Sequence, residues 1–297
     1  ERDRRPRRRF QEHMTHGAAA SDFSAAVLAE FVRQGVRHVV VCPGSRSQAL
    51  ALAAARCEEV GLLSLSARVD ERGAGFLALG LAVETGVPAL VITTSGTAVG
   101  NLLPSVLEAH HSGVPLILLT ADRPEELRGI GSNQTTDQVG MFGEFVRFAR
   151  EVEAPSVGGF DPDFPVELAR AAISAAAGHS GAPGPVQVNM AFREPLSGEF
   201  DPRILDGVTA LKNAPSRHPV DSLTLTPEPF TVVIAGHAAG DEAESTARAL
   251  SAPLLAEVSS GAHFGPNLVV AYRELLRLPD FGGRVRRVIV FGHPTLS

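Results

Sequence analysis

Short apolar runs alternate with helix-like patterns along most of this chain, and this alternation constrains the fold more than any other feature. Unbroken apolar strands that alternate with helices are typical of a parallel sheet covered by helices on both faces. We therefore expect an α/β protein with a doubly wound parallel sheet. The expected strands lie at Arg37–Cys42, at the start of Leu62–Thr85, and at Ala89–Thr93, Leu116–Thr120 and Val186–Met190, with a further segment at Phe145–Val152.

The stretches between these runs predict helices. Ser21 can cap the first helix, in which Phe23, Val27 and Phe31 share one face. Gly35 then ends that helix. The remaining helices are expected at Gln48–Arg56, from the turn Asp70–Arg72 to Thr85, from the turn Thr94–Thr97 to about His111, and at Pro165–Ala177.

Composition divides the chain into four parts. Residues 1–20 are rich in arginine and have no apolar period, so we predict a disordered tail there. Residues 21–194 hold the sheet domain, and the proline-rich residues 195–229 are predicted to be a linker without regular elements. Residues 230–297 begin a second, Rossmann-like α/β domain, which is too short to be complete, so we interpret the sequence as truncated. Its expected elements are strands at Thr231–Ala235 and Arg287–Phe291, a segment at Pro253–Val258, and helices at Asp241–Leu250 and about Asn267–Leu278.

Composition also excludes several classes of protein. Hydrophobic residues make up 44% and charged residues 20% of the 297 residues, as in ordinary globular proteins. The net charge of −6 gives no reason to expect binding to nucleic acid or to a membrane. No apolar run approaches the roughly 20 residues that span a bilayer, and no secretory signal is visible. We therefore expect a cytoplasmic protein, in which both cysteines are reduced.

Four polar turns follow four of the expected strands. They are Pro43–Arg46, Asp70–Arg72, Thr94–Thr97 and Ala121–Pro124. In open α/β sheets, ligands bind at the carboxyl ends of the strands. Because the strands are expected to run in parallel, these turns should meet at one edge of the sheet and form a site.

Glu71 stands at the start of an apolar helix. A helix that is apolar on most faces is expected to be buried, and burial raises the pKa of a carboxyl group at its mouth. One interpretation is an acid that shares a proton with a ring nitrogen of a bound molecule. The other is an acidic residue that stabilises the helix dipole, and the residues alone favour it.

The other turns suit anions. Ser45 and Arg46 present a hydroxyl group and a guanidinium at a strand-to-helix turn, a combination that binds carboxylate or phosphate. A Pro-Gly turn with a solvated arginine explains them equally well, and a hydroxyl-capped turn explains Thr94–Thr97 at least as well. Arg123, with Asn133 and Gln134 in the long polar loop that follows, could bind the carboxylates and hydroxyls of a small substrate.

Nucleophilic and metal-dependent chemistry have little support in the sequence. No serine lies in a G-x-S-x-G turn. No histidine or cysteine spacing typical of a zinc site is present, so we expect no metal site formed by this chain's own residues.

Five stretches, taken in order, resemble one enzyme family: VCPGSRSQALALA, VDERGAGFLALGLA, TTSGTAVGNLLPSVLEA, LLTADRPEELRGIGSNQTTDQ and FGHPTLS. They are similar to the 2-succinyl-5-enolpyruvyl-6-hydroxy-3-cyclohexene-1-carboxylate synthases, which are thiamine-diphosphate-dependent enzymes of menaquinone biosynthesis. The second and third stretches are shared more loosely by thiamine-diphosphate enzymes generally. The resemblance implies that residues 21–194 are the pyrimidine-binding domain and that residues 230–297 begin the central domain.

The resemblance also implies an activity, namely decarboxylation of 2-oxoglutarate and addition of the resulting carbanion to isochorismate. Glu71 matches the glutamate that hydrogen-bonds N1′ of the aminopyrimidine ring, so it would be the catalytic acid. Thr94, Ser95, Gly96 and Thr97 would lie near the cofactor, and Ser45, Arg46, Arg123, Asn133 and Gln134 would hold the substrates.

The resemblance also has implications for metal binding, activity and oligomeric state. The ligands of Mg²⁺ are expected in a C-terminal diphosphate-binding domain that this sequence lacks, so the chain alone is expected to be inactive. The cofactor of such enzymes lies between subunits, which implies a homodimer or homotetramer. Two alternatives stay open: another thiamine-diphosphate carboligase or decarboxylase, and a non-catalytic fragment that binds a ligand or a partner.

Overall fold

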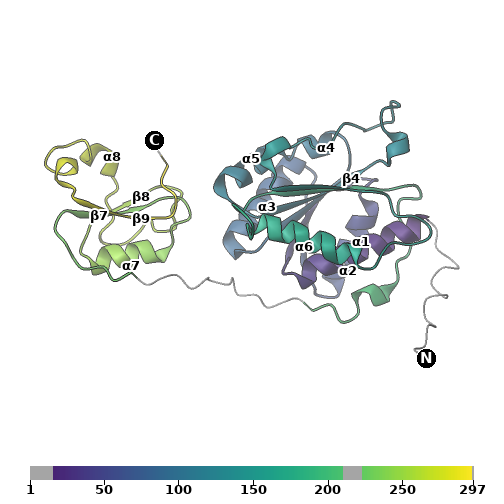
Figure 1. The fold of residues 1–297 in the computed structure, drawn as a ribbon, viewed down its shortest axis with the longest axis horizontal. Coiled ribbons are helices and arrows are strands. Elements are labelled where there is room, and N and C mark those ends of the chain that lie inside the picture. Colours follow the sequence, from purple (N-terminus) through teal and green to yellow (C-terminus); the bar gives the residue numbers. More distant parts are fainter. Residues whose placement is uncertain (1–15, 210–222, 296–297) are drawn as a thin grey trace. The chain divides into compact units, whose positions relative to one another are not determined.

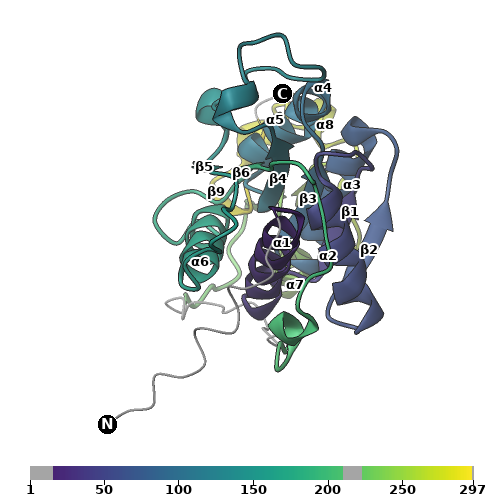
Figure 2. The ribbon, with the colours of Figure 1, turned by 90° about the vertical axis from the view of Figure 1, so that its right-hand side faces the viewer.

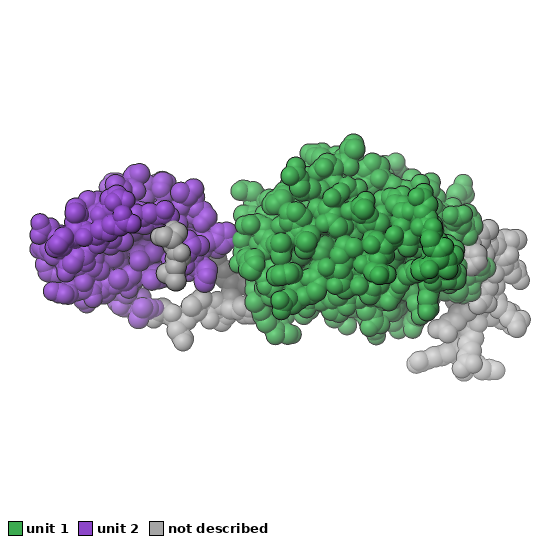
Figure 3. Space-filling view, turned by 90° about the horizontal axis from the view of Figure 1, so that it is seen from above, with its two compact units in different colours: residues 1–216 green, residues 217–297 purple. Residues whose placement is uncertain are grey.

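The computed structural model describes residues 16–209 and 223–295. The chain divides into two compact units, residues 1–216 and residues 217–297, which Figure 3 shows in different colours. The first 15 residues of the predicted tail, residues 210–222 of the predicted linker and the last two residues lie outside the described residues.

Unit 1 is built on a six-stranded sheet with the order β2-β1-β3-β4-β6-β5. All of its strand pairs are parallel. The predicted α/β class with a parallel sheet is therefore confirmed. In chain order the strands are β1 His38–Val41, β2 Ser64–Ala67, β3 Ala89–Thr93, β4 Leu116–Asp122, β5 Phe148–Val152 and β6 Val186–Ala191.

Helices cover both faces of this sheet. Alternate strand residues point to opposite sides, so that Leu90 and Ile92 join one core whereas Val91 joins the other. The first core lies under α1 (His16–Arg33), α2 (Gln48–Glu59) and α6 (Phe164–Ala176), with α1 between α2 and α6 (Figure 2). The second lies under α3 (Glu71–Thr85), α4 (Thr97–Gly100) and α5 (Leu103–Ser112), and Figure 1 shows α4 and α5 across the sheet from α6.

The first helix begins earlier than expected. It starts at His16, so residues 16–20 belong to α1 and not to a disordered tail. Ala19 and Ala20 are buried, and their burial explains why the helix extends over them. Ser21 is not a cap: its hydroxyl group donates to the Gly198 carbonyl at 2.7 Å and accepts from the Gly198 N–H at 3.0 Å.

The predicted linker also begins too early. Residues 195–209 pack on unit 1, where Leu196 and Phe200 contact the core and Val208 is 6% exposed. A short 3₁₀ helix, Pro202–Leu205, lies in this segment, and Asp201 caps it by accepting from the Arg203 N–H. The prediction rests on the proline content of this segment, which does not reveal that its apolar side chains pack on the core.

Two predicted helices are interrupted or exposed. The expected helix from Thr97 to about His111 is broken into α4 and α5, because Pro104 has no N–H to donate within a continuous helix. The apolar helix α3 is not buried on most faces. Ala74, Gly75, Ala78 and Ala82 are buried, whereas Phe76 is 44% exposed and Val83 is 53% exposed.

Unit 2 has a three-stranded parallel sheet with the order β8-β7-β9. Its strands are β7 Thr231–Ala235, β8 Leu254–Ala256 and β9 Arg287–Phe291, and α7 (Asp241–Ala249) packs against them. The helix expected at about Asn267–Leu278 is only one turn, α8 (Tyr272–Leu275). The backbone of Asn267 and Val269 pairs instead with Leu254, which takes this segment out of the helical conformation.

Candidate active site

The polar turns after β1, β2, β3 and β4 lie at the carboxyl edge of the unit 1 sheet. The register aligns Val41 with Ile92, and Thr93 with Thr120 and Asn189, so neighbouring strands end at similar levels. The first and third turns touch directly. A Cβ on Gly44 would lie 2.3 Å from the Thr94 Cβ, and only glycine permits so close an approach.

Asp70 and Glu71 have different hydrogen-bond partners at the start of α3. Asp70 is the N-cap, and its Oδ1 accepts from the Gly73 N–H at 2.6 Å. The half-buried Glu71 is therefore not needed as a cap, and its Oε2 accepts from the Asn101 Nδ2 at 3.3 Å. Burial, together with the nearby charges of Glu71 and Asp70, raises the pKa of the Cys42 thiol to about 12.

The turn Thr94–Thr97 is held in a conformation that needs glycine. Gly96 has φ of 82°, in the left-handed region, and a Cβ there would lie 2.9 Å from the Gln134 carbonyl oxygen. Thr94 and Ser95 are buried, whereas Thr97 is exposed. The Ser95 hydroxyl group donates to the Gln134 carbonyl at 3.1 Å, and the Gln134 side chain donates to the Ser95 carbonyl at 3.2 Å.

Arg123 joins this turn from the end of β4. One terminal nitrogen of its guanidinium donates to the Ser95 Oγ at 2.6 Å and to the Gln134 carbonyl at 2.5 Å. The structure therefore brings together three of the residues that the sequence singled out. Asn133 and Ser45 are exposed at the same edge, and among the described residues no hydrogen bond joins their side chains to this group.

Arg46 is buried with incomplete pairing. Its side chain donates to the Phe192 carbonyl at 2.9 Å and lies 3.6 Å from the Glu194 carboxylate, which is largely exposed. Its Nε is buried without a hydrogen-bond partner among the described residues. Burial, reinforced by the positive charge of Arg123, lowers the pKa of this guanidinium. A buried cation of this kind favours the approach of an anion.

Three buried polar residues lie beneath these turns, and the sequence patterns assigned none of them a role of its own. They are Asp122, Gln138 and Asn189, which are 1%, 0% and 2% exposed. Burial raises the pKa of Asp122, against the lowering effect of hydrogen bonds from Asn189 and from the Arg123 backbone. The signal in the sequence was the pair of polar residues, Gln187 and Asn189, that alternate with apolar residues along β6.

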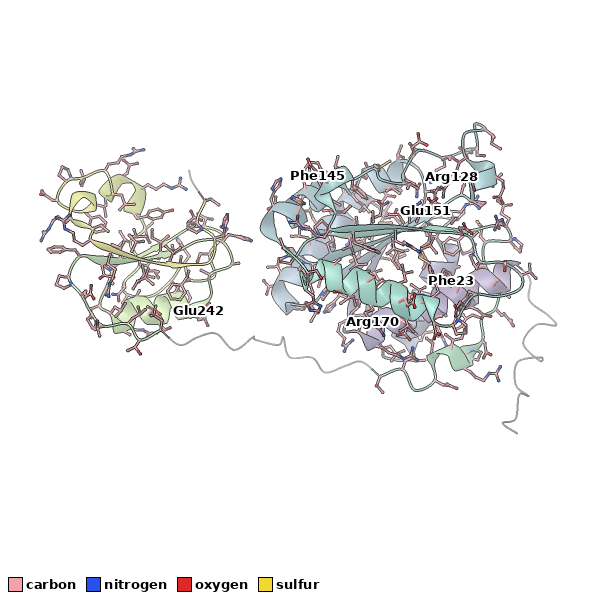
Figure 4. All side chains as sticks on the ribbon, in the orientation of Figure 1. Phe23, Arg128, Phe145, Glu151, Arg170 and Glu242 are labelled. Atoms are coloured by element: carbon pink, nitrogen blue, oxygen red, sulfur yellow. The ribbon has the colours of Figure 1, made fainter. Side chains whose placement is uncertain are left out.

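Arg128 adds an ion-pair network beside the turn after β4. It pairs with Asp122 at 2.9 Å and with Glu151 on β5, and Figure 4 shows Arg128 and Glu151 near each other. Within residues 16–209 and 223–295, no group of three or more histidine, cysteine or acidic side chains could hold a metal ion. The same residues contain no helix that is both long and apolar enough to cross a membrane.

Comparison with known proteins shows which proteins this chain is similar to. Residues 22–141 match the family model of the thiamine pyrophosphate enzyme N-terminal TPP binding domain. Two relatives, both named 2-succinyl-5-enolpyruvyl-6-hydroxy-3-cyclohexene-1-carboxylate synthase, come from Leifsonia xyli subsp. xyli and Clavibacter michiganensis subsp. michiganensis. They are 58% and 55% identical to this chain, in each case over 95% of it. The alignments cover 48% and 49% of those proteins, so the chain spans about half the length of the curated relatives it matches.

The parallel sheet and the matched family model identify unit 1 as similar to the N-terminal TPP binding domain of thiamine pyrophosphate enzymes. Among enzymes with such a domain, the chain is similar to the 2-succinyl-5-enolpyruvyl-6-hydroxy-3-cyclohexene-1-carboxylate synthases.

Proposed function

We propose that this chain supplies the aminopyrimidine side of a thiamine diphosphate site in an enzyme that decarboxylates 2-oxoglutarate and joins the remaining four-carbon unit to isochorismate. The name of the relatives and the matched domain support the cofactor and the place in menaquinone biosynthesis. When bound, the cofactor supplies the carbon centre at which a 2-oxo acid loses CO₂.

The residues at this edge fit that cofactor. Glu71 is half-buried, it is free of the capping role that Asp70 fills, and Asn101 holds one of its oxygens. A carboxyl group so placed can share a proton with N1′ of an aminopyrimidine ring. The Thr94–Thr97 turn, fixed by Gly96, would pack against the cofactor from the neighbouring strand end.

The unpartnered Nε of Arg46 is the observation on which the substrate proposal rests. Arg46 and Arg123 lie close enough for one positive charge to lower the pKa of the other. Two such guanidinium groups suit substrates with carboxylates, and both 2-oxoglutarate and isochorismate carry two. Ser45, Asn133 and Gln134 would contact the substrate oxygens. This arrangement favours the proposed reaction over a decarboxylase that acts on a monocarboxylate.

The exposed face of α3 supports a homo-oligomer. Phe76 and Val83 on α3 are 44% and 53% exposed, and Val69 just before the helix is 87% exposed. Exposed apolar side chains of this kind are typical of a surface that another polypeptide covers. We propose that a second copy covers this face in a dimer or tetramer. Mg²⁺ would be bound by residues beyond this chain, so the 297 residues alone would be inactive. A cytoplasmic location stays a prediction.

The test is an assay of a protein that spans the full length of the curated relatives, with thiamine diphosphate and Mg²⁺ present. We expect CO₂ release from 2-oxoglutarate that depends on isochorismate, and no comparable turnover with pyruvate. Equal turnover of pyruvate would favour another thiamine-diphosphate carboligase or decarboxylase. Cofactor binding without turnover of any 2-oxo acid would favour a non-catalytic role.

A further inference from the structure

A closed set of buried hydrogen bonds runs beneath the candidate site. We propose that Gln138 and Asn189 are positioning residues, which use these bonds to fix the cofactor turn at Gly96 relative to Arg123. The catalytic consequence of this role rests on the proposed function, whereas its structural consequence does not.

Gln138 connects three segments with one side chain. It is fully buried, and its Oε1 accepts from the Gly96 N–H at 3.1 Å. Its Nε2 donates to the Ala121 carbonyl at 2.9 Å and to the Asn189 Oδ1 at 2.7 Å. The turn after β3, the end of β4 and strand β6 are therefore joined through a single amide group.

Asn189 carries the connection from Gln138 to the end of β4. Its Nδ2 donates to the Asp122 Oδ2 at 2.8 Å, and the Asp122 Oδ1 accepts from the Arg123 N–H at 2.7 Å. The Arg123 side chain then returns to the turn after β3 through its 2.6 Å hydrogen bond to Ser95. Because Ser95 precedes Gly96 in the chain, this path of hydrogen bonds begins and ends at the turn after β3.

Burial makes this path stiff. A buried donor or acceptor that loses its hydrogen-bond partner destabilises the fold by the full desolvation cost of that group. A shift of the Gly96 turn or of Arg123 therefore requires the other groups of the path to move with it. Gly96 and Arg123 can therefore hold their relative positions before any ligand binds, and such preorganisation favours catalysis.

Gln187 offers a matched control on the same strand as Asn189. It is also a glutamine, it is 1% exposed, and its Nε2 donates to the Thr120 Oγ1 at 3.2 Å and to the Gln138 carbonyl at 3.1 Å. It bonds neither the Gly96 turn nor Arg123. If the role of Gln138 were purely structural, replacing either glutamine would have the same effect on Gly96 and on kcat.

The first experiment measures amide hydrogen exchange in this 297-residue chain. Gln138→Met removes the acceptor for the Gly96 N–H, so we expect exchange at Gly96 to become at least about tenfold faster. Gln187→Met should leave Gly96 exchange unchanged, although we expect both variants to lower the unfolding midpoint to a similar extent. Equal exchange at Gly96 in the two variants would overturn the proposal.

The second experiment measures kcat in a protein with the full length of the curated relatives. We expect Gln138→Met to lower kcat by about 10- to 100-fold, as is typical when residues that orient a site are removed, and Gln187→Met to keep kcat within about threefold of wild type. Equal losses of kcat would contradict a positioning role.

A third variant, Gln138→Glu, keeps an oxygen acceptor for the Gly96 N–H and serves if Gln138→Met does not fold. It should keep Gly96 exchange within about threefold of wild type, and rapid exchange would count against the proposal. If the wild-type protein has no turnover, the proposed function fails, while the exchange comparison still decides the role of Gln138.

Discussion

The two arginines of the candidate site differ in how completely they are paired. Arg123 donates to two oxygens within unit 1, whereas Arg46 keeps a buried Nε without a partner among the described residues. Arg123 is therefore already oriented before a substrate arrives, and Arg46 is the group that gains most from an anion. In the proposed function, the substrate side of the site would depend on these two side chains more than on any regular element.

Replacing Arg123 tests its proposed role in substrate binding. In a protein of the relatives' full length, Arg123→Ala should raise the KM for isochorismate by at least about tenfold, because a charge-assisted hydrogen bond to a carboxylate is lost. Arg170→Ala, which removes an exposed arginine on α6 (Figure 4), is the matched control and should leave this KM unchanged. Equal KM values in wild type and Arg123→Ala would rule out the assignment.

Sequence patterns could predict the turn residues but not the residues beneath them. Arg46, Glu71 and Arg123 follow strands β1, β2 and β4, so their place at the sheet edge follows from the parallel topology. Gln138 and Asn189 acquire their role only through partners that are far away in the chain. A polar residue in an apolar strand indicates a buried hydrogen bond, but the pattern does not say to which atom.

At the scale of the element, α3 shows what helix periodicity alone can and cannot predict. Its start at Glu71, after the cap Asp70, and its end before Gly86, which has φ of 68°, follow ordinary capping rules. Which faces of α3 are buried cannot be predicted in this way, because its residues are apolar on the exposed and the buried faces alike. Gly75 packs closely against Ser105 of α5, where an added Cβ would lie 2.1 Å from the Ser105 Oγ.

Two glycine substitutions in α3 should have opposite effects on stability. Gly75→Ala should lower the free energy of unfolding by about 1–3 kcal/mol, because the new methyl group overpacks the contact with Ser105. Gly80→Ala should raise it by up to about 1 kcal/mol, because alanine favours the helix and nothing lies within 4 Å of the added Cβ. Denaturant unfolding measures both, and a stabilising Gly75→Ala would show that the helices are not so close.

At the scale of the molecule, unit 1 is held together by segments far apart in the chain. The segment after β6 returns to α1, where Asp22 accepts a hydrogen bond from the Asp201 N–H at 2.8 Å. The alternating pattern predicted the sheet, but not this return, since residues 195–209 have neither helical nor strand periodicity. The three-stranded sheet of unit 2 was predictable for the same reason as the first.

Asp22 gives this contact a pH dependence. Burial raises the pKa of Asp22 above its ordinary value of 3.8, and the charge of Asp201 adds to the effect. A carboxyl group with a raised pKa in the folded state destabilises the fold as pH increases from the unfolded value through the folded one. Asp22→Asn should therefore be more stable relative to wild type at pH 7 than at pH 3, as measured by urea unfolding. A difference independent of pH would contradict this reading of the contact.

The most direct test of the central claim is turnover by Glu71→Gln in a protein that spans the full length of the curated relatives. Glutamine keeps the size of the side chain but cannot exchange a proton with a ring nitrogen, so we predict a loss of kcat of at least about 100-fold with an unchanged unfolding midpoint. Asp70→Asn is the control, because asparagine also caps helices and kcat should stay within about twofold. A Glu71→Gln protein that keeps the wild-type rate would contradict the assignment of this edge as the aminopyrimidine side of the site.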